Sequence, residues 1–347
     1  MANQNPQWNP VATIDKLGAA TYRSCQFAAK TTKDTTAWQK RMRSRLAALL
    51  GYLDQEKVPA AARTVESVHR EGYVRRKIVI RTSPHGAMPM YLLIPDDLDT
   101  PAPAVLALHG HGYGVKDIVG LWDDGSERLK PDGYHRDFAA ELALRGFVVL
   151  APEIFGFGGR HIRHDPDDPA SSRQSDCYRI SMNAIMHGGT VQGIKVWENM
   201  RALDYLTTLK EVDADRIGAM GISGGGQNTL FTTSLEPRIK ACVISGYFCQ
   251  WEGSILGCDH CLCNFIPGIL ELGEMSDIAA LIAPRPCLAE HGKRDLDFPV
   301  AYTRKAVREA RAAWDAFGAG ELLQTDIFDG PHRINGEKAY DFLEAHL

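Results

Sequence analysis

The sequence predicts an α/β protein in which a mostly parallel central sheet has helices on both faces. Apolar runs of five or six residues, such as 104–108 and 240–245, have the continuous hydrophobicity of strands that are buried on both sides. Between such runs lie longer segments whose apolar residues recur every three or four positions, as in amphipathic helices. The alternation of these two patterns from residue 104 onward is typical of a single α/β domain.

Residues 1–72 are predicted to form an N-terminal helical extension that packs on the core. Trp38, Met42 and Leu46 recur at helical spacing, and basic residues lie off that stripe. No alternation typical of strands is found before residue 73. We therefore assign residues 73–347 to the α/β domain.

Within that domain the predicted elements follow one another without internal repeats. A period of two over residues 73–94 predicts an antiparallel hairpin. Two long segments, 153–189 and 246–274, lack either period and are predicted to be irregular lid or rim loops. Further strands are predicted at 104–108, 147–151, 240–245, 286–291 and 322–328, and helices at 135–145, 191–209, 300–317 and 337–347.

Composition narrows the class of protein. The 347 residues include 44% hydrophobic and 24% charged residues, as in an ordinary globular protein, and the net charge of −4 gives no reason to expect a nucleic acid or membrane partner. No apolar run approaches the ~18 residues of a membrane span, and the polar N-terminus does not resemble a signal peptide. We expect a cytoplasmic protein with a small-molecule substrate, and the sequence leaves open a homo-oligomer.

The segment 216–226 contains a G-x-S-x-G turn between a predicted strand and a predicted helix. Ser223 lies at the centre of this turn, and Gly221 and Gly225 are small enough to let the strand and the helix approach each other. A serine at such an elbow projects its hydroxyl beyond the sheet, where it can act as a nucleophile. The simpler alternative is a glycine-rich turn that only joins two elements.

A nucleophilic serine needs a base and an acid that orients the base. In this chain order both should follow the serine, each in a loop after a strand. His332 follows the last predicted strand, and Asp295 and Asp297 follow the preceding one. Either acid could instead cap the next helix, and His332 could be an ordinary loop residue, but the three placements together predict a Ser-Asp-His triad.

The oxyanion of an acyl-transfer reaction needs two backbone N–H donors. One is expected from Gly224, directly after the serine, and the other from the HGHG motif at 109–112, which follows an early strand. We assign the second donor to His111, with Gly112 as the alternative. The imidazoles of His109 and His111 are expected to hold this loop rather than to transfer protons.

The run from Cys258 to Cys263 contains three cysteines and His260, which are residue types that can bind zinc. No second ligand pair lies at the regular distance that structural zinc sites usually show, so we expect no metal and no cofactor. We expect this run to be a loop that borders the active site.

Several motifs together resemble α/β-hydrolases of the dienelactone hydrolase-like and acetyl xylan esterase-like group. The resemblance covers most of residues 85–347 and implies ester hydrolysis through an acyl-enzyme without a cofactor, with Asp295 as the triad acid. Dienelactone hydrolases proper have cysteine as the nucleophile, so serine here favours an ordinary esterase. The motifs are HGHG at 109–112, GFGGR at 156–160, GIKVWENMRALDYL at 193–206, VDADRIGAMGISGGG at 212–226, IAPRP at 282–286 and GPH at 330–332.

The sequence thus favours a serine carboxylesterase for small, acetyl-type esters of a bulky, carbohydrate-like alcohol. Tyr113, Trp122, Phe248 and Trp251 fall in predicted loops where they could stack on a sugar ring. The covering segments show no amphipathic lid helix of the kind that shelters long lipid chains. Two alternatives are a peptidase of the prolyl oligopeptidase type, which normally carries a large N-terminal propeller, and a non-catalytic binding protein of the same fold, which would generally lack a triad residue.

Overall fold

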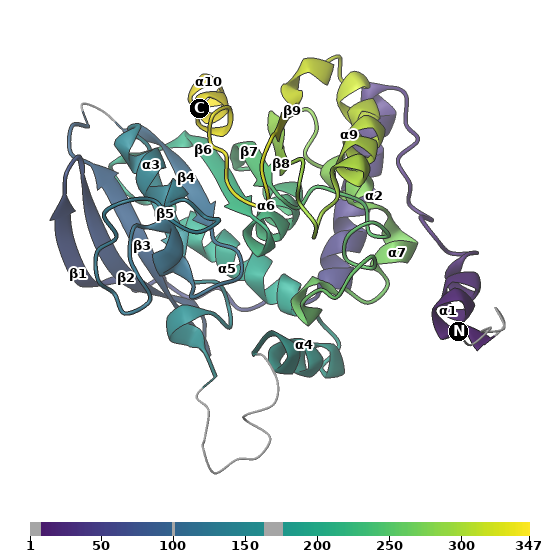
Figure 1. The fold of residues 1–347 in the computed structure, drawn as a ribbon, viewed down its shortest axis with the longest axis horizontal. Helices are drawn as coiled ribbons and strands as arrows, with labels where there is room; N and C mark the ends of the chain where they lie inside the picture. Colours follow the sequence, from purple (N-terminus) through teal and green to yellow (C-terminus); the bar gives the residue numbers. More distant parts are fainter. Residues whose placement is uncertain (1–7, 99–100, 163–175) are drawn as a thin grey trace, which may run out of the picture.

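The computed structural model describes residues 8–98, 101–162 and 176–347 (Figure 1). One sheet has nine strands in the order β1-β2-β3-β5-β4-β6-β7-β8-β9. The six strands from β5 to β9 in this order are parallel to their neighbours, and the first three pair antiparallel. The predicted fold class is therefore confirmed. The strands are β1 (Arg63–Arg70), β2 (Tyr73–Ser83), β3 (Gly86–Pro95), β4 (Ala102–Leu108), β5 (Val148–Pro152), β6 (Val212–Ile222), β7 (Ile239–Ser245), β8 (Cys287–Gly292) and β9 (Leu323–Phe328).

Helices cover both faces of the sheet. Because successive side chains of a strand point to opposite faces, Leu106 of β4 lies in one apolar cluster and Val105 in another. The first cluster receives α2, α5, α6, α8 and α9, and the second receives α3 and α10. The helices are α1 (Pro10–Gly18), α2 (Thr32–Leu50), α3 (Phe138–Leu144), α4 (Asp176–Met186), α5 (Val191–Leu206), α6 (Gly224–Leu235), α7 (Ile269–Leu272), α8 (Met275–Ala279), α9 (Val300–Asp315) and α10 (Ala339–His346).

The N-terminal region differs from the prediction in one element. Helix α2 packs its stripe of Trp38, Met42 and Leu46 into the core, as predicted, whereas α1 has no buried residue and stands at the edge of the molecule (Figure 1). The prediction that no strand precedes residue 73 was wrong, because β1 pairs with β2. Most of β1 is exposed, so this edge strand has no buried face and no alternating hydrophobicity in its sequence.

The two segments predicted to be irregular differ from each other. Residues 246–274 are largely irregular, with a short 3₁₀ turn at Leu262–Asn264 and the four-residue helix α7. In the other segment the prediction was wrong for α4, and residues 163–175 lie outside the described part of the chain. The buried side of α4 contains small or polar residues such as Cys177 and Ala184, which produce no clear apolar stripe.

No helix within the described ranges combines the length and the apolar character needed to cross a lipid bilayer. The carboxyl ends of the parallel strands β4, β6, β7, β8 and β9 meet at one edge of the sheet, and each leads into a loop that carries a predicted site residue or its neighbour. This edge is where the candidate site lies.

Candidate active site

The turn after β6 is a strained elbow. Ser223 has φ 57° and ψ −122°, a conformation that costs a residue with a side chain free energy and that persists where surrounding structure enforces it. A Cβ atom at Gly225 would lie 1.9 Å from the carbonyl oxygen of Leu108, and one at Gly221 would lie 2.5 Å from the carbonyl oxygen of Gly225. The two glycines are therefore required by close backbone approach, as predicted.

His332 and Asp295 form a hydrogen-bonded pair at this edge. The Nδ1–H of His332 donates to Oδ2 of Asp295 over 2.6 Å, and the carboxylate is fully buried. Its other oxygen accepts the backbone N–H groups of Asp297 and Phe298, each over 3.0 Å. These bonds fix the carboxylate in one orientation. Asp297 is exposed, although its carboxylate oxygen lies within 4.8 Å of ligand atoms of the pair.

The ring of His332 lies between two aromatic rings, with centroids 5.8 Å from Phe298 and 5.5 Å from Tyr134. Its Nε2 is buried and has no hydrogen-bond partner in the described structure, so it accepts no bond from Ser223 in this conformation. The ring edge lies beside Gly246, since a Cβ there would be 2.8 Å from Cε1 of His332. Gly246 follows Ser245, whose carbonyl accepts the N–H of Ser223 over 3.0 Å. The unpartnered nitrogen therefore lies near the elbow.

The HGHG loop is held by a buried network that the sequence analysis missed. The backbone N–H of Gly110 donates to Nε2 of His135 over 2.8 Å, and Nδ1–H of His135 donates to Asp117 over 2.8 Å. Arg128 in turn donates to Asp117 over 2.9 Å. Burial lowers the pKa of His135 to about 4, so the ring is neutral at pH 7 and has the tautomer that this chain of bonds requires.

Two further contacts fix the same loop. The hydroxyl of Tyr134 donates to the carbonyl oxygen of His111. Nε2 of His109 accepts the backbone N–H of Ile154 over 3.0 Å, so this imidazole holds the loop, as expected. Gly110 is required by close approach, because a Cβ there would lie 2.3 Å from the Tyr134 hydroxyl. The only signal in the sequence for Tyr134 and His135 was their residue type, since their partners lie elsewhere in the chain.

The two predicted oxyanion donors lie next to each other. A Cβ at Gly224 would be 3.0 Å from Nδ1 of His111, so the imidazole edge contacts the start of α6. Among the described residues, neither the N–H of Gly224 nor that of His111 has a hydrogen-bond acceptor. Unpaired N–H groups at a helix start favour an anion. Their role as an oxyanion hole remains a prediction.

On its other edge, His111 faces three cysteines. Nε2 of His111 lies 3.4 Å from Sγ of Cys263 and 3.8 Å from Sγ of Cys177, and Cys261 completes the group. Hydrogen bonds from the thiols of Cys177 and Cys261 lower the pKa of the Cys263 thiol, and a hydrogen bond to Cys261 raises the pKa of Cys177. Although burial opposes the charged form, hydrogen bonds to Cys261 and Cys263 raise the pKa of His111 to about 9.

Only part of the predicted cysteine cluster takes part in this group. Cys258 is exposed, and Nε2 of His260 lies 3.3 Å from the carbonyl oxygen of Asp297. The sequence analysis did not single out Cys177, which lies on α4. As a single cysteine in a segment predicted to be irregular, it gave no indication of a shared site.

Two of the four aromatic residues suggested for substrate stacking cannot have that role in this conformation. Phe248 and Trp251 are fully buried in the first apolar cluster. The hydroxyl of Tyr113 donates to the carbonyl of Leu121 over 3.1 Å, which fixes its ring. Trp122 is 41% exposed, with the Arg128 guanidinium 5.1 Å from its ring centroid.

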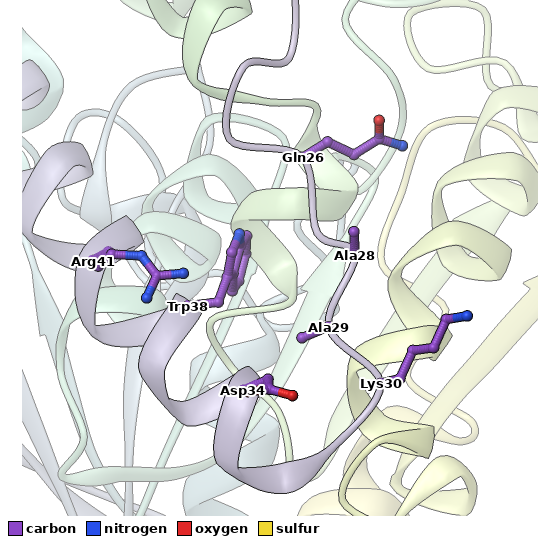
Figure 2. Close-up of a pocket in the computed structure, with 7 residues that line it drawn as sticks. All are labelled: Gln26, Ala28, Ala29, Lys30, Asp34, Trp38 and Arg41. Atoms are coloured by element: carbon purple, nitrogen blue, oxygen red, sulfur yellow. The ribbon is translucent and has the colours of Figure 1, made fainter.

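A hollow of about 450 Å³ lies away from the candidate site, beside the start of α2 (Figure 2). Five of its seven lining residues are exposed, and none of them belongs to the loops that follow the parallel strands. Its position at an open surface, away from the loops that follow the parallel strands, gives no support for a catalytic role. The lining residues are Gln26, Ala28, Ala29, Lys30, Asp34, Trp38 and Arg41.

Comparison with known proteins identifies the family of the chain. The sequence profile of the Abhydrolase family matches residues 13–315. YtaP of Bacillus subtilis strain 168, whose name assigns it provisionally to the hydrolases, is 29% identical over 290 residues, which cover 81% of this chain and 90% of that protein.

Two solved structures share the fold. A Bacteroides fragilis protein provisionally named an acetyl xylan esterase has a TM-score of 0.75 and 19% identity, covering 93% of this chain and 82% of its own. A glucuronoyl esterase from Solibacter usitatus has a TM-score of 0.61 and 16% identity, covering 90% of this chain and 93% of its own. The α/β-hydrolase fold predicted from the motifs is confirmed.

Proposed function

Because the chain belongs to the Abhydrolase family, we propose that it is a serine carboxylesterase with Ser223, His332 and Asp295 as its triad. The observation that carries the proposal is the His332–Asp295 pair. Its Nδ1–H is bound to a buried carboxylate, and its Nε2 is left without a partner beside the strained elbow. This is the arrangement that a general base needs before it takes a proton from a serine hydroxyl.

The proposed reaction has two halves. Nε2 of His332 takes the hydroxyl proton of Ser223 as Oγ attacks the ester carbonyl, and the resulting imidazolium gives that proton to the leaving alcohol. A water molecule then loses a proton to His332 as it attacks the acyl-enzyme, and the serine hydroxyl is restored as the acid leaves. Asp295 stabilises the imidazolium in both halves.

The proposed oxyanion hole consists of the N–H groups of Gly224 and His111. Support comes from their lack of acceptors, from their proximity, and from the position of Gly224 at the start of α6. Gly112 stays the alternative second donor. A negatively charged oxygen placed between them would satisfy two donors at once.

The proposed substrates are small, acetyl-type esters of a bulky, carbohydrate-like alcohol. Trp122 supports this, because it is an exposed aromatic ring in the segment that follows the HGHG loop. The name of one structural neighbour, an acetyl xylan esterase, combines an acetyl group with a carbohydrate alcohol, and the name of another, a glucuronoyl esterase, supports only the broader class of carbohydrate esters. A series of p-nitrophenyl esters tests the acyl part, and kcat/KM rising steadily from acetate to decanoate would overturn the preference for short chains.

We also propose a cytoplasmic location, where the free cysteines would stay reduced.

Labelling with a fluorophosphonate tests whether Ser223 is activated. We expect the wild-type chain to be labelled on Ser223 and to hydrolyse p-nitrophenyl acetate, and Ser223→Ala to lose the label and about 10⁶-fold in kcat. Ser44→Ala, which changes an exposed serine on α2, is the matched control and should behave as wild type. Near wild-type turnover in Ser223→Ala would overturn the proposed mechanism. Labelling without turnover of any ester, but with cleavage of peptides, would favour the peptidase alternative.

A further inference from the structure

We infer that His111, Cys177, Cys261 and Cys263 form a structural metal site that binds one zinc ion. Three separate parts of the chain supply the four ligands, namely the loop after β4, the start of α4 and the loop before α7. Their four ligand atoms lie within 4.8 Å of one another. The catalytic mechanism proposed above uses none of the three thiols.

The distances fit a tetrahedral ion. With Zn–S and Zn–N bonds of about 2.3 and 2.1 Å, tetrahedral geometry places a sulfur and a nitrogen ligand about 3.5 Å apart, and two sulfurs about 3.8 Å apart. Nε2 of His111 lies 3.4 Å from Sγ of Cys263 and 3.8 Å from Sγ of Cys177. These two separations bracket the expected value, and all four ligand atoms lie within 4.8 Å of one another.

The donor set identifies both the kind of ion and the kind of site. Three cysteines and one histidine are a donor set typical of structural zinc, whereas magnesium and calcium prefer oxygen ligands. Four protein ligands leave no open position for substrate or water, so the site is structural rather than catalytic. Cys177 and Cys263 lie in a separate small apolar cluster with Ile154, Phe157 and Val191, which keeps water away from the sulfurs.

Besides the cysteine, α4 is held chiefly by the partly buried Ile180 and by the Asp176 carboxylate, which accepts hydrogen bonds from His161 and Ile162. Its buried residues are Asp176, Cys177, Ser181 and Ala184, of which only Cys177 and Ala184 have apolar side chains. Met186 on the same helix is 80% exposed. An 11-residue helix with so small an apolar contact is marginal by itself, and a metal–thiolate bond at its first turn would anchor it.

The charge of the surroundings also fits. Three thiolates around a zinc ion carry a net charge of −1, and a buried site of that charge needs a nearby cation. Lys195 on α5 is 3% exposed and interacts electrostatically with the thiols of Cys177 and Cys263. Among the described residues it forms no ion pair with a carboxylate. The metal site would supply the negative charge that this buried ammonium group otherwise lacks.

The site would also position the proposed oxyanion donor, a consequence that rests on the proposed function. Nε2 of His111 would bind the ion, while the carbonyl of His111 accepts the Tyr134 hydroxyl. The residue would thus be held through its ring and through its backbone. The residue would then stay in place beside Gly224.

Metal analysis of the full-length chain, purified without chelator or metal-affinity resin, tests the inference without reference to activity. We expect about one zinc per chain by mass spectrometry. After zinc is removed under reducing conditions, Co²⁺ should bind in the same stoichiometry. It should give the visible bands of tetrahedral Co²⁺ and the near-ultraviolet charge-transfer bands of cobalt–thiolate bonds, and zinc should displace it.

Variants assign the ligands. Cys177→Ser and Cys261→Ser should reduce metal content about tenfold or more, because each loses one of four ligands. Cys258→Ser is the matched control, since Cys258 belongs to the same cysteine-rich run but lies exposed, outside the group. It should keep full metal content and ester hydrolysis. If a ligand variant fails to fold, the cobalt spectrum of the wild-type chain still decides the donor set.

Three results would overturn the inference. The first is a reduced, folded wild-type chain that binds neither zinc nor cobalt. The second is a disulfide among Cys177, Cys261 and Cys263 in the chain as purified, detected by peptide mass mapping. The third is bound metal whose amount is the same in Cys177→Ser as in wild type. None of these results depends on whether Ser223 is a nucleophile, so failure of the metal site and failure of the proposed esterase function are distinguishable.

Discussion

Two histidines lie on either side of the elbow, and their partners differ. His332 donates its Nδ1–H to the buried carboxylate of Asp295, and its Nε2 has no hydrogen-bond partner among the described residues. His111 directs Nε2 at a group of thiols and places the other edge of its ring against Gly224. In the roles proposed above, the same kind of side chain transfers protons in one place and binds a metal ion in the other.

The difference shows that the role of a histidine follows from which ring nitrogen is left available. A carboxylate on Nδ1 fixes the tautomer of the ring and leaves the distant nitrogen without a proton. Thiols on Nε2 occupy that nitrogen, so His111 can act on the reaction only through its position. Three experiments separate these two roles, and a fourth tests the network that holds the HGHG loop.

The largest effect is expected from replacing His332, whose Nε2 is the proposed base. His332→Gln should lower kcat about 10⁶-fold, because a triad that acts as a unit loses nearly all of its benefit with the base. His111→Gln keeps the backbone N–H, so it should lower kcat far less, by about 10- to 100-fold, while losing the bound metal. Steady-state kinetics and metal analysis of both variants check this. Equal losses of kcat, or loss of metal in His332→Gln, would show that the two roles are not separate.

The next effect concerns the acid partner of His332. Asp295→Asn should lower kcat about 10⁴-fold, because an amide in place of the carboxylate favours the wrong tautomer of the imidazole. Asp297→Asn changes an exposed neighbour and should lower kcat less than threefold. The same esterase assay on both variants gives the ranking. A larger loss in Asp297→Asn would mean that the imidazole exchanges partners during the reaction.

Removing the metal should have a smaller effect on rate and a local effect on structure. We expect kcat to fall about 10- to 100-fold, because a misplaced oxyanion donor loses part of its stabilising effect. Cleavage within α4 by a protease should become faster, since its anchor at Cys177 is gone. Limited proteolysis followed by mass spectrometry locates the cut. Unchanged cleavage within α4, with the metal shown to be absent, would contradict the anchoring role.

The last effect concerns stability rather than rate and involves a third histidine, His135, which holds the HGHG loop. Its folded-state pKa of about 4 lies below the ordinary value of 6.5, so the unfolded chain binds the proton more tightly. The free energy of unfolding should therefore fall as the pH is lowered from about 6.5 to about 4, by about 3 kcal/mol from this group. Burial also lowers the pKa of His291, which acts in the same direction.

Urea unfolding at pH 7, 5.5 and 4.5 measures this dependence. His135→Asn removes the titrating group, so its free energy of unfolding should fall less steeply over the same range than that of wild type. The remaining slope comes from groups such as His291. Identical slopes in the two proteins would show that His135 does not titrate as its burial requires.

The sequence was sufficient to predict the strands that are buried on both faces of the sheet. Runs such as 104–108 and 240–245 predicted β4 and β7 to within two residues, because parallel strands inside a sheet are apolar throughout. Strand β1 was missed because it lies at the sheet edge and buries almost nothing. Helix α4 was missed because its buried side contains small residues.

The candidate site likewise contains residues that the sequence could predict and residues that it could not. Ser223, Asp295 and His332 could be singled out because each follows a predictable strand, and the fold brings Asp295 and His332 into hydrogen-bond contact. No such rule of topology predicts the cluster of His111 with the three cysteines. Cys177 lies 66 residues from His111, and Cys263 lies 152 residues from it, and only tertiary packing brings them together. Sequence spacing therefore argued against a metal where the folded chain favours one.

The backbone conformation of Ser223 lowers the stability of the protein in favour of its proposed catalytic activity. At φ 57° and ψ −122°, a serine costs about 1–3 kcal/mol that glycine would largely avoid. Ser223→Gly should therefore unfold at a higher temperature than the wild-type protein while hydrolysing no ester. Selection for thermal stability alone would favour replacement of this serine. Among variants screened only for expression and solubility, we therefore expect inactive substitutions of Ser223 to be enriched.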